Sequence, residues 1–298
     1  MGGENLKLLR GFSTPCKLYK NCYNGDMVYH NDNQKAGFPL LSSRNYRAAF
    51  TLAEILITLG VIGVVAALTL PSLITKYQEK QLVTSYLRVY SLLENAYRHV
   101  QAEYGTFENW SGAVITINGG DGKPDTSLSQ RKNLYEYMIK PYIQVNEAFL
   151  PADWNWDGKT NCWPKSSSNL GGEPYSSNYN GELTHKPAVS LKSGECIVLA
   201  YANGDFVVDL NSKKGPNVLG KDQFVFNFDP LKPERIKPGF YQRWWTDISE
   251  YCNASKGVNS WHNGISCGFW IVRHHNMDYL HLPYEEVRAQ WQKEGGDW

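Results

Sequence analysis

The chain has 298 residues and nearly balanced charge, with 30 lysine and arginine residues against 29 aspartate and glutamate residues. Residues 1–49 carry seven basic and three acidic residues, which leaves 23 basic and 26 acidic residues in 50–298. The larger part is therefore slightly acidic. It has no basic stripe, which argues against a nucleic-acid-binding protein, because affinity for phosphate depends on clustered lysine and arginine side chains.

An apolar run from Phe50 to Leu70 is the first predicted element. At a rise of ~1.5 Å per residue, its roughly 21 residues form a helix about 30 Å long, which matches the hydrocarbon thickness of a bilayer. The run contains one acidic residue, Glu54, and a carboxylate costs about 2.5–3.5 kcal/mol if it faces lipid near the bilayer centre. The basic residues before the run predict a cytoplasmic N-terminal side. An ordinary membrane anchor with an acid near the interface is the simplest alternative.

The residues around Glu54 resemble a known processing signal. The segment Arg47–Glu54 (RAAFTLAE), the apolar run and Pro71 at its end are similar to the N-terminus of the type IV pilin and type II secretion pseudopilin family. The resemblance implies that a prepilin peptidase cleaves between Ala49 and Phe50 and methylates the new α-amino group of Phe50. It also implies that Glu54 is needed for assembly and that Pro71 kinks the helix. The family usually has glycine before the cut, so Ala49 is expected to affect the efficiency of processing.

The same resemblance predicts a leader, a long helix and a head. Either Met1 or Met27 fits as the start of the leader. The helix is expected to cross the inner membrane, with the head on the extracytoplasmic side and later in a periplasmic or extracellular fibre. The three parts are residues 1–49 (cytoplasmic leader, removed), 50–105 (helix, transmembrane over 50–70 and amphipathic over 72–105) and 106–298 (head).

Beyond Pro71 the apolar residues recur at steps of three and four, which predicts one apolar stripe on a helix. A helix from Phe50 to about Tyr104 would be roughly 80 Å long. Two helices joined by a turn at Pro71 are the alternative. The stripe consists of Leu82, Tyr86, Val89, Leu93, Ala96, Tyr97, Val100 and Tyr104.

The head is predicted to be β-rich, with a short helix within 131–145. The Asn203-Gly204 pair is typical of a hairpin between two of its strands. A long helix followed by an antiparallel sheet defines an α+β fold with one head domain. The predicted strands are Ala113–Ile117, Cys196–Tyr201, Phe206–Leu210, Phe224–Phe228 and Gly268–Arg273.

Four cysteines remain outside the leader: Cys162, Cys196, Cys252 and Cys267. An even number in an exported domain favours disulfides. Three pairings are open; Cys252 with Cys267 closes the shortest loop, and Cys162 with Cys196 would attach an irregular segment to the first strand of the hairpin. Free thiols and a zinc site are the alternatives, although no C-x₂-C spacing is present.

Two loops are candidates for calcium, which prefers carboxylate and amide oxygens. The first has Asp153, Asn155 and Asp157 at alternate positions before a glycine, but Pro164 stands where an EF-hand places its closing acid.

The second loop contains Asp209, Asn211 and Asp222 and resembles a turn in pseudopilin heads, some of which hold calcium. Lys213 and Lys214 argue against a tight cation site there. For both loops the alternative is a polar turn with solvated acids.

Catalytic motifs are missing or incomplete. Residues 215–221 match G-x-x-x-x-G-K, but Asp222 replaces the Ser/Thr that binds magnesium and a strand-like segment follows where a helix is required. His274, His275 and His281 fit no metal-ligand pattern, and no G-x-S-x-G is present. The chain is therefore not expected to be an enzyme.

The resemblance implies a structural subunit of a type IV pilus or a type II secretion pseudopilus, a minor one by the size of its head. Its expected partners are other pilin or pseudopilin subunits, prepilin peptidase and the inner membrane, with no nucleic acid. The alternative is an adhesin or binding module displayed on a fibre, with Trp154 and Trp156 on a tryptophan-rich head. Which fibre system the chain serves stays open.

Overall fold

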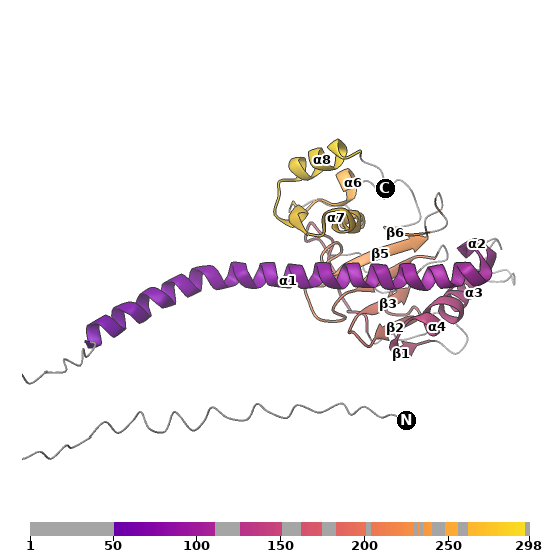
Figure 1. Ribbon diagram of the computed structural model, residues 1–298, viewed down its shortest axis with the longest axis horizontal. Coiled ribbons are helices and arrows are strands. Elements are labelled where there is room, and N and C mark those ends of the chain that lie inside the picture. The colour runs from indigo at the N-terminus through magenta and orange to yellow at the C-terminus, as the bar shows by residue number, and fades with distance from the viewer. Residues whose placement is uncertain are drawn as a thin grey trace, which may run out of the picture. The chain divides into compact units, whose positions relative to one another are not determined.

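The computed structural model describes residues 51–110, 126–150, 162–174, 183–200, 204–228, 232, 235–239, 248–255 and 262–295 (Figure 1). By its internal contacts the chain divides into two units, Met1–Ile57 and Thr58–Trp298. The predicted strand Ala113–Ile117 lies outside the described residues.

Helix α1 (Leu52–Tyr104) is continuous over 53 residues and has Pro71 inside it, so a single helix is confirmed. A proline removes one backbone donor from the helical ladder. Hydroxyl groups close to it donate to backbone carbonyls: Thr69 to Val65 at 2.9 Å and Thr75 to Pro71 at 3.0 Å. The helix ends before Gly105, whose positive φ of 84° suits the residue that follows a helix terminus.

The two halves of α1 differ in burial. Every described residue from Thr51 to Gln78 is exposed except Ala66, which is half-buried. From Val83 onward one stripe is buried at steps of three and four, as predicted, although Tyr104 is 42% exposed and Leu82 only half-buried. The buried residues are Val83, Tyr86, Val89, Leu93, Glu94, Ala96, Tyr97 and Val100.

This stripe packs against a six-stranded antiparallel sheet whose strands follow one another in chain order, with the second half of α1 lying across it (Figure 1). The ring of Tyr86 lies 4.6 Å from that of Phe224, and the ring of Tyr97 lies 4.6 Å from that of Phe228. The α+β architecture is therefore confirmed. The strands are β1 (Val145–Phe149), β2 (Ala188–Leu191), β3 (Cys196–Leu199), β4 (Phe206–Asp209), β5 (Gln223–Phe228) and β6 (Ile236–Pro238).

The predicted hairpin is present, since Leu199 of β3 pairs with Phe206 of β4. Sequence patterns missed β1, β2 and β6. Strand β1 is largely exposed and contains Asn146 and Glu147, and β6 is three residues long and ends in proline. Asparagine, glutamate and proline are depleted in strands, and β1 and β6 form because they pair with β2 and β5.

Two buried carboxylates attach α1 to the sheet. Glu94 accepts a hydrogen bond from the backbone N–H of Ile236 in β6. Glu195, which precedes β3, accepts one from the Ser85 hydroxyl at 2.9 Å and pairs with Arg88. Burial is the main cause that raises the pKa of Glu94.

The predicted last strand, Gly268–Arg273, is wrong: these residues lie in helix α7 (Cys267–His274). Their aromatic and β-branched side chains favour a strand, but tertiary contacts outweigh that propensity. Gly268 lies so close to α1 that an added Cβ would stand 2.3 Å from the Tyr86 hydroxyl, and Cys267 is bonded to Cys252.

The remaining helices are short and lie around the sheet. The predicted helix within 131–145 is confirmed and contains a π-helical segment. The elements are α2 (Phe107–Trp110), α3 (Thr126–Asn133), η1 (Leu134–Ile139), α4 (Lys140–Tyr142), α6 (Ile248–Tyr251), η3 (Asp278–Leu280) and α8 (Tyr284–Lys293).

Candidate functional site

The start of α1 has a reciprocal cap. The backbone N–H of Glu54 donates to Thr51 Oγ1 at 3.2 Å, and the Glu54 carboxylate accepts from the backbone N–H of Thr51 at 2.8 Å and from its hydroxyl at 2.9 Å. This is a capping box, for which Thr-x-x-Glu is the sequence signal. Glu54 thus has a local structural role besides the assembly role that the resemblance implies, and the T-L-A-E sequence is its signal.

The apolar part of α1 has the length and composition of a membrane-spanning helix, and none of its most apolar window is buried. Leu68 is 76% exposed and Ile57 is 66% exposed. Monomeric soluble proteins rarely expose apolar patches larger than a few hundred Å². Exposure of so many large apolar side chains along one helix is therefore unusual for a monomeric soluble protein. The cleavage junction of Ala49 and Phe50 lies outside the described residues.

The loop from β4 to β5 brings Asp209, Asn211 and Asp222 together. Asp209 Oδ1 accepts from the backbone N–H of Asn211 at 3.1 Å, and its Oδ2 accepts from Gln223 Nε2 at 2.9 Å. The Asn211 amide in turn donates to Asp222 Oδ2 at 3.3 Å. The sequence had placed these three residues in one candidate site, and the fold places them in contact.

Asp222 organises the end of the same loop. Its carboxylate accepts from the backbone N–H groups of Asn217 at 2.9 Å and Val218 at 2.7 Å. Both Asp209 and Asp222 are fully buried, and within the described residues neither forms an ion pair. Burial raises the pKa of Asp209 to about 8, with the Asp222 charge adding to the shift and the Gln223 hydrogen bond opposing it. Burial also raises the pKa of Asp222.

The calcium site expected in this loop stays a prediction. The side-chain oxygens of Asn211 and Asn217 are buried and have no hydrogen-bond partner, and two buried carboxylates lack a compensating charge. Nowhere in the described residues do three His, Cys, Asp or Glu side chains gather as a metal site. Amide and main-chain oxygens would thus have to complete the six to eight ligands that calcium takes. Lys214, which argued against this site, is exposed.

Two disulfides join cysteines in the described part of the chain, Cys162–Cys196 and Cys252–Cys267. Of the three possible pairings, the structure has the one in which Cys252–Cys267 closes the shortest loop and Cys162 is attached to Cys196 at the start of β3. Free thiols and zinc are excluded for these four residues.

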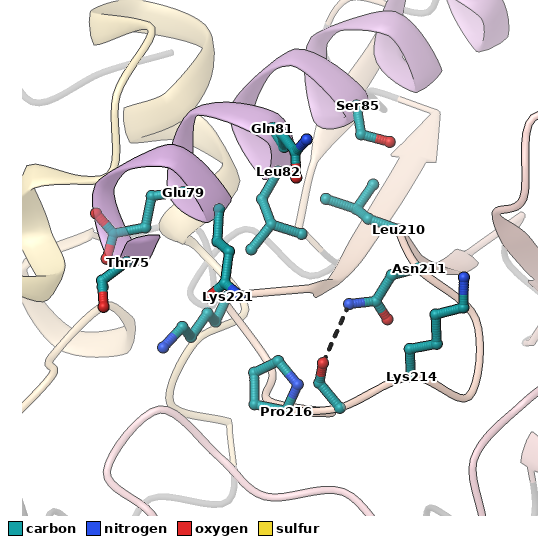
Figure 2. A pocket seen from close by; sticks show the side chains of 12 residues that line it. Thr75, Glu79, Gln81, Leu82, Ser85, Leu210, Asn211, Lys214, Pro216 and Lys221 are labelled. Carbon is teal, nitrogen blue, oxygen red and sulfur yellow. Dashed lines mark hydrogen bonds between the residues drawn. The ribbon is translucent and has the colours of Figure 1, made fainter. Parts of the chain in front are cut away.

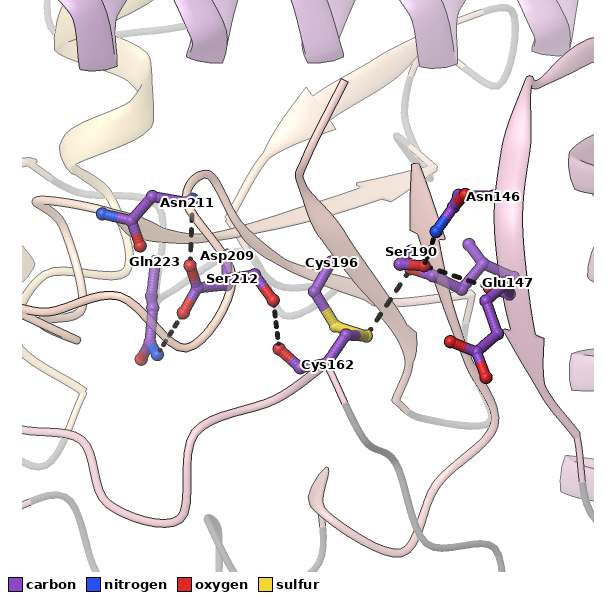
Figure 3. Close-up of a disulfide and its surroundings, with 10 residues drawn as sticks. Asn146, Glu147, Cys162, Ser190, Cys196, Asp209, Asn211, Ser212 and Gln223 are labelled. Carbon is purple, nitrogen blue, oxygen red and sulfur yellow. Dashed lines mark hydrogen bonds between the residues drawn. A yellow bond between two sulfur atoms is a disulfide. The ribbon is translucent and has the colours of Figure 1, made fainter. Parts of the chain in front are cut away.

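The first disulfide lies beside the candidate calcium loop (Figure 3). Cys196 is the register partner of Asp209 across β3 and β4, and the Ser212 hydroxyl donates to the Cys162 carbonyl at 2.8 Å. The disulfide therefore holds one side of the loop in place.

The other candidate residues have structural roles or lie outside the described residues. Strand β5 follows residues 215–221, where a phosphate-binding loop needs a helix. His281 bonds Glu79 and His274 pairs with Glu294, so these two do not share a site. Trp163, Trp270 and Trp291 are buried. Asp153, Asn155, Asp157, Trp154 and Trp156 lie outside the described residues.

Comparison with known proteins adds no assignment. No model of a known family matches the chain, and no curated protein or solved structure matches it. A functional interpretation therefore depends on the residues and geometry described above.

Proposed function

We propose that this chain is a structural subunit of a fibre of the type IV pilus or type II secretion pseudopilus class. The first half of α1 holds the subunit in the inner membrane, and the same segment later joins the helical core of the fibre. The observation that carries this proposal is the division of one helix into an exposed apolar half and a half that is packed on a folded head.

The hydrophobic effect favours burial of the first half of α1 in lipid or against other helices. Full burial of one leucine or isoleucine side chain contributes about 1.5–3 kcal/mol. Between Leu52 and Ile74 at least a dozen large apolar side chains are more than 40% exposed. Lipid covers these apolar side chains before assembly, and neighbouring copies of the same segment bury them in a fibre.

Glu54 supplies register within that core. Once prepilin peptidase has cut between Ala49 and Phe50, the methylated α-amino group of Phe50 in a neighbouring subunit is the natural partner for the Glu54 carboxylate. A buried ion pair adds little net stability, but an unpaired buried charge is strongly unfavourable. The pair therefore selects one alignment of the helices over others.

The size of the head favours a minor or specialised subunit. The alternative of a fibre-displayed adhesin depends on Trp154 and Trp156, which lie outside the described residues, and the described large tryptophans are buried. No observation on the described residues favours that alternative.

The test compares Glu54→Ala with Glu54→Gln in cells that assemble the fibre. Glutamine at the third helical position keeps a capping box but removes the charge, so it separates the local role of Glu54 from its pairing role. We expect both variants to insert into the membrane and both to fall at least tenfold in fibre incorporation.

Normal incorporation of Glu54→Gln would show that Glu54 only caps the helix and would refute the pairing role. Mass spectrometry of the N-terminal peptide provides the second readout, and we expect N-methylated Phe50. A mature chain that still begins at Met1 or Met27 would contradict processing.

A further inference from the structure

A cavity of about 710 Å³ lies between α1 and the loop that joins β4 to β5 (Figure 2). The helix contributes polar side chains from Thr75 to Ser85, including Gln78 and Gln81. The loop contributes Lys214 and Lys221. A volume of this size accommodates a small ligand or a lipid headgroup.

The charges in this cavity are unbalanced in favour of cations. Lys214 is exposed and Lys221 is half-buried, and in the described part of the chain neither ammonium group forms an ion pair. The one acidic residue of the lining, Glu79, is already engaged, because both of its carboxylate oxygens lie within 3.0 Å of His281 Nε2. The cavity therefore presents two free positive charges and several amide and hydroxyl groups.

The position of the cavity along α1 indicates which class of ligand Lys214 and Lys221 contact. Ile74 is the last exposed aliphatic residue of the apolar segment, with the exposed Tyr77 one turn further on, and Thr75 is the first residue of the lining. At ~1.5 Å per residue the next turn lies about 5 Å further along the helix, and the headgroup layer on one side of a bilayer is about 5–8 Å thick. When the apolar segment occupies the hydrocarbon, the end of the cavity that Thr75 lines is at the level of the lipid phosphates.

We propose that this cavity binds the phosphate headgroup of an anionic phospholipid while the subunit resides in the membrane. Lys221, which lies at the end of the cavity near Thr75 and Glu79, pairs with the phosphate, and Lys214 adds positive charge at the other end (Figure 2). The amides of Gln78 and Gln81 hydrogen-bond the glycerol part of the headgroup. Basic side chains are attracted electrostatically to an anionic membrane surface. Lys76 and Lys80, both exposed on the same turns of α1, add to the local attraction.

This inference rests on the membrane-resident stage of the proposed function and goes beyond it by naming a ligand. It also implies that the bound lipid orients the head against the bilayer before assembly. An acidic segment of a second copy of this chain is the competing occupant, and it would require no lipid.

The experiment uses the full chain in a neutral detergent, with short-chain phosphatidylglycerol as the ligand and isothermal titration calorimetry as the readout. All samples contain a chelator, because Asn211 also lines the cavity and calcium could bridge to the phosphate. We expect saturable binding that falls at least tenfold in the double variant Lys214→Gln/Lys221→Gln. The control Lys192→Gln, an exposed lysine between β2 and β3, should bind as the unmodified chain does.

Three results would overturn the proposal: no binding by the unmodified chain, equal binding by the double variant, or binding of inorganic phosphate as tight as that of the lipid. The last result would identify free phosphate as the ligand. Equal melting temperatures of the variants establish that the substitutions leave the fold intact. Because binding in micelles needs neither cleavage nor assembly, its failure is distinguishable from a failure of the Glu54 test.

Discussion

The two halves of α1 share one continuous helical backbone but have opposite surroundings. From Leu52 to Ile74 the large apolar side chains are exposed on all sides, whereas from Val83 to Val100 a single stripe is buried against the sheet. A helix that is apolar all round needs lipid or other helices around it, and an amphipathic helix needs one folded face. The comparison shows that one element has an exposed apolar half and a half packed on the sheet, and that the change occurs between Ile74 and Val83, about two and a half helical turns.

The most severe test of this comparison is a matched pair of leucine substitutions. Leu93 is fully buried and Leu73 is 63% exposed, so Leu93→Ala should lower the free energy of unfolding by about 2–5 kcal/mol. Leu73→Ala should change it by less than about 0.5 kcal/mol. Chemical unfolding of the full chain in detergent measures both. Equal losses in the free energy of unfolding for the two variants would contradict the difference in burial between the two halves of α1.

Removal of a disulfide tests whether the head holds its half of α1 independently of the apolar half. The Cys252–Cys267 bridge spans 15 residues, and loss of such a loop constraint costs about 3 kcal/mol. We expect Cys252→Ser/Cys267→Ser to destabilise the head by that amount while membrane insertion, measured by alkaline extraction, is unchanged. Loss of insertion in this variant would mean that the apolar half depends on the head.

Calcium and pH should affect only the head. The pKa of Asp209 is raised from 3.8 to about 8 by burial, so its neutral form is the one that the folded state prefers. That stability is fully present below about pH 4 and is lost as pH rises through about 8. The calcium-free melting temperature should therefore fall between pH 5 and pH 8.5.

Calcium requires the ionised carboxylates, so its stabilisation should be larger at the higher pH. At 100 times its dissociation constant, it adds about 2.7 kcal/mol. Asp222→Asn should abolish the effect, and Glu147→Gln on the exposed strand β1 should preserve it. If calcium leaves the melting temperature of the unmodified chain unchanged at pH 8.5, the loop is a polar turn.

Much of this arrangement could be predicted from the sequence, because the signals were local. The apolar run, the stripe after Pro71 and the Asn203-Gly204 hairpin depend on residues close together in the chain. The contact between Asp209, Asn211 and Asp222 was predictable for the same reason, since one loop joins them.

The failures occurred where partners distant in sequence decide the structure. Helix α7 contains the strand-like segment Phe269–Val272, yet it is helical because Gly268 fits beneath Tyr86 and Cys267 is bonded to Cys252. The cavity beside α1 could not be predicted from the sequence for the same reason, since Thr75 and Lys221 are brought together only by the fold. The capping role of Glu54 is different, because its signal, Thr51-x-x-Glu54, is local in the sequence.

The most direct measurement is photo-crosslinking in cells, with a photoreactive amino acid placed at Val61 or at Ala96. Val61 is 58% exposed on the apolar half and Ala96 is 2% exposed beneath the head. If the first half of α1 is the assembly surface, the Val61 probe gives a ladder of covalent oligomers of this chain and the Ala96 probe gives none. An absence of oligomers from the Val61 probe in cells that display the fibre would contradict the assembly role of α1.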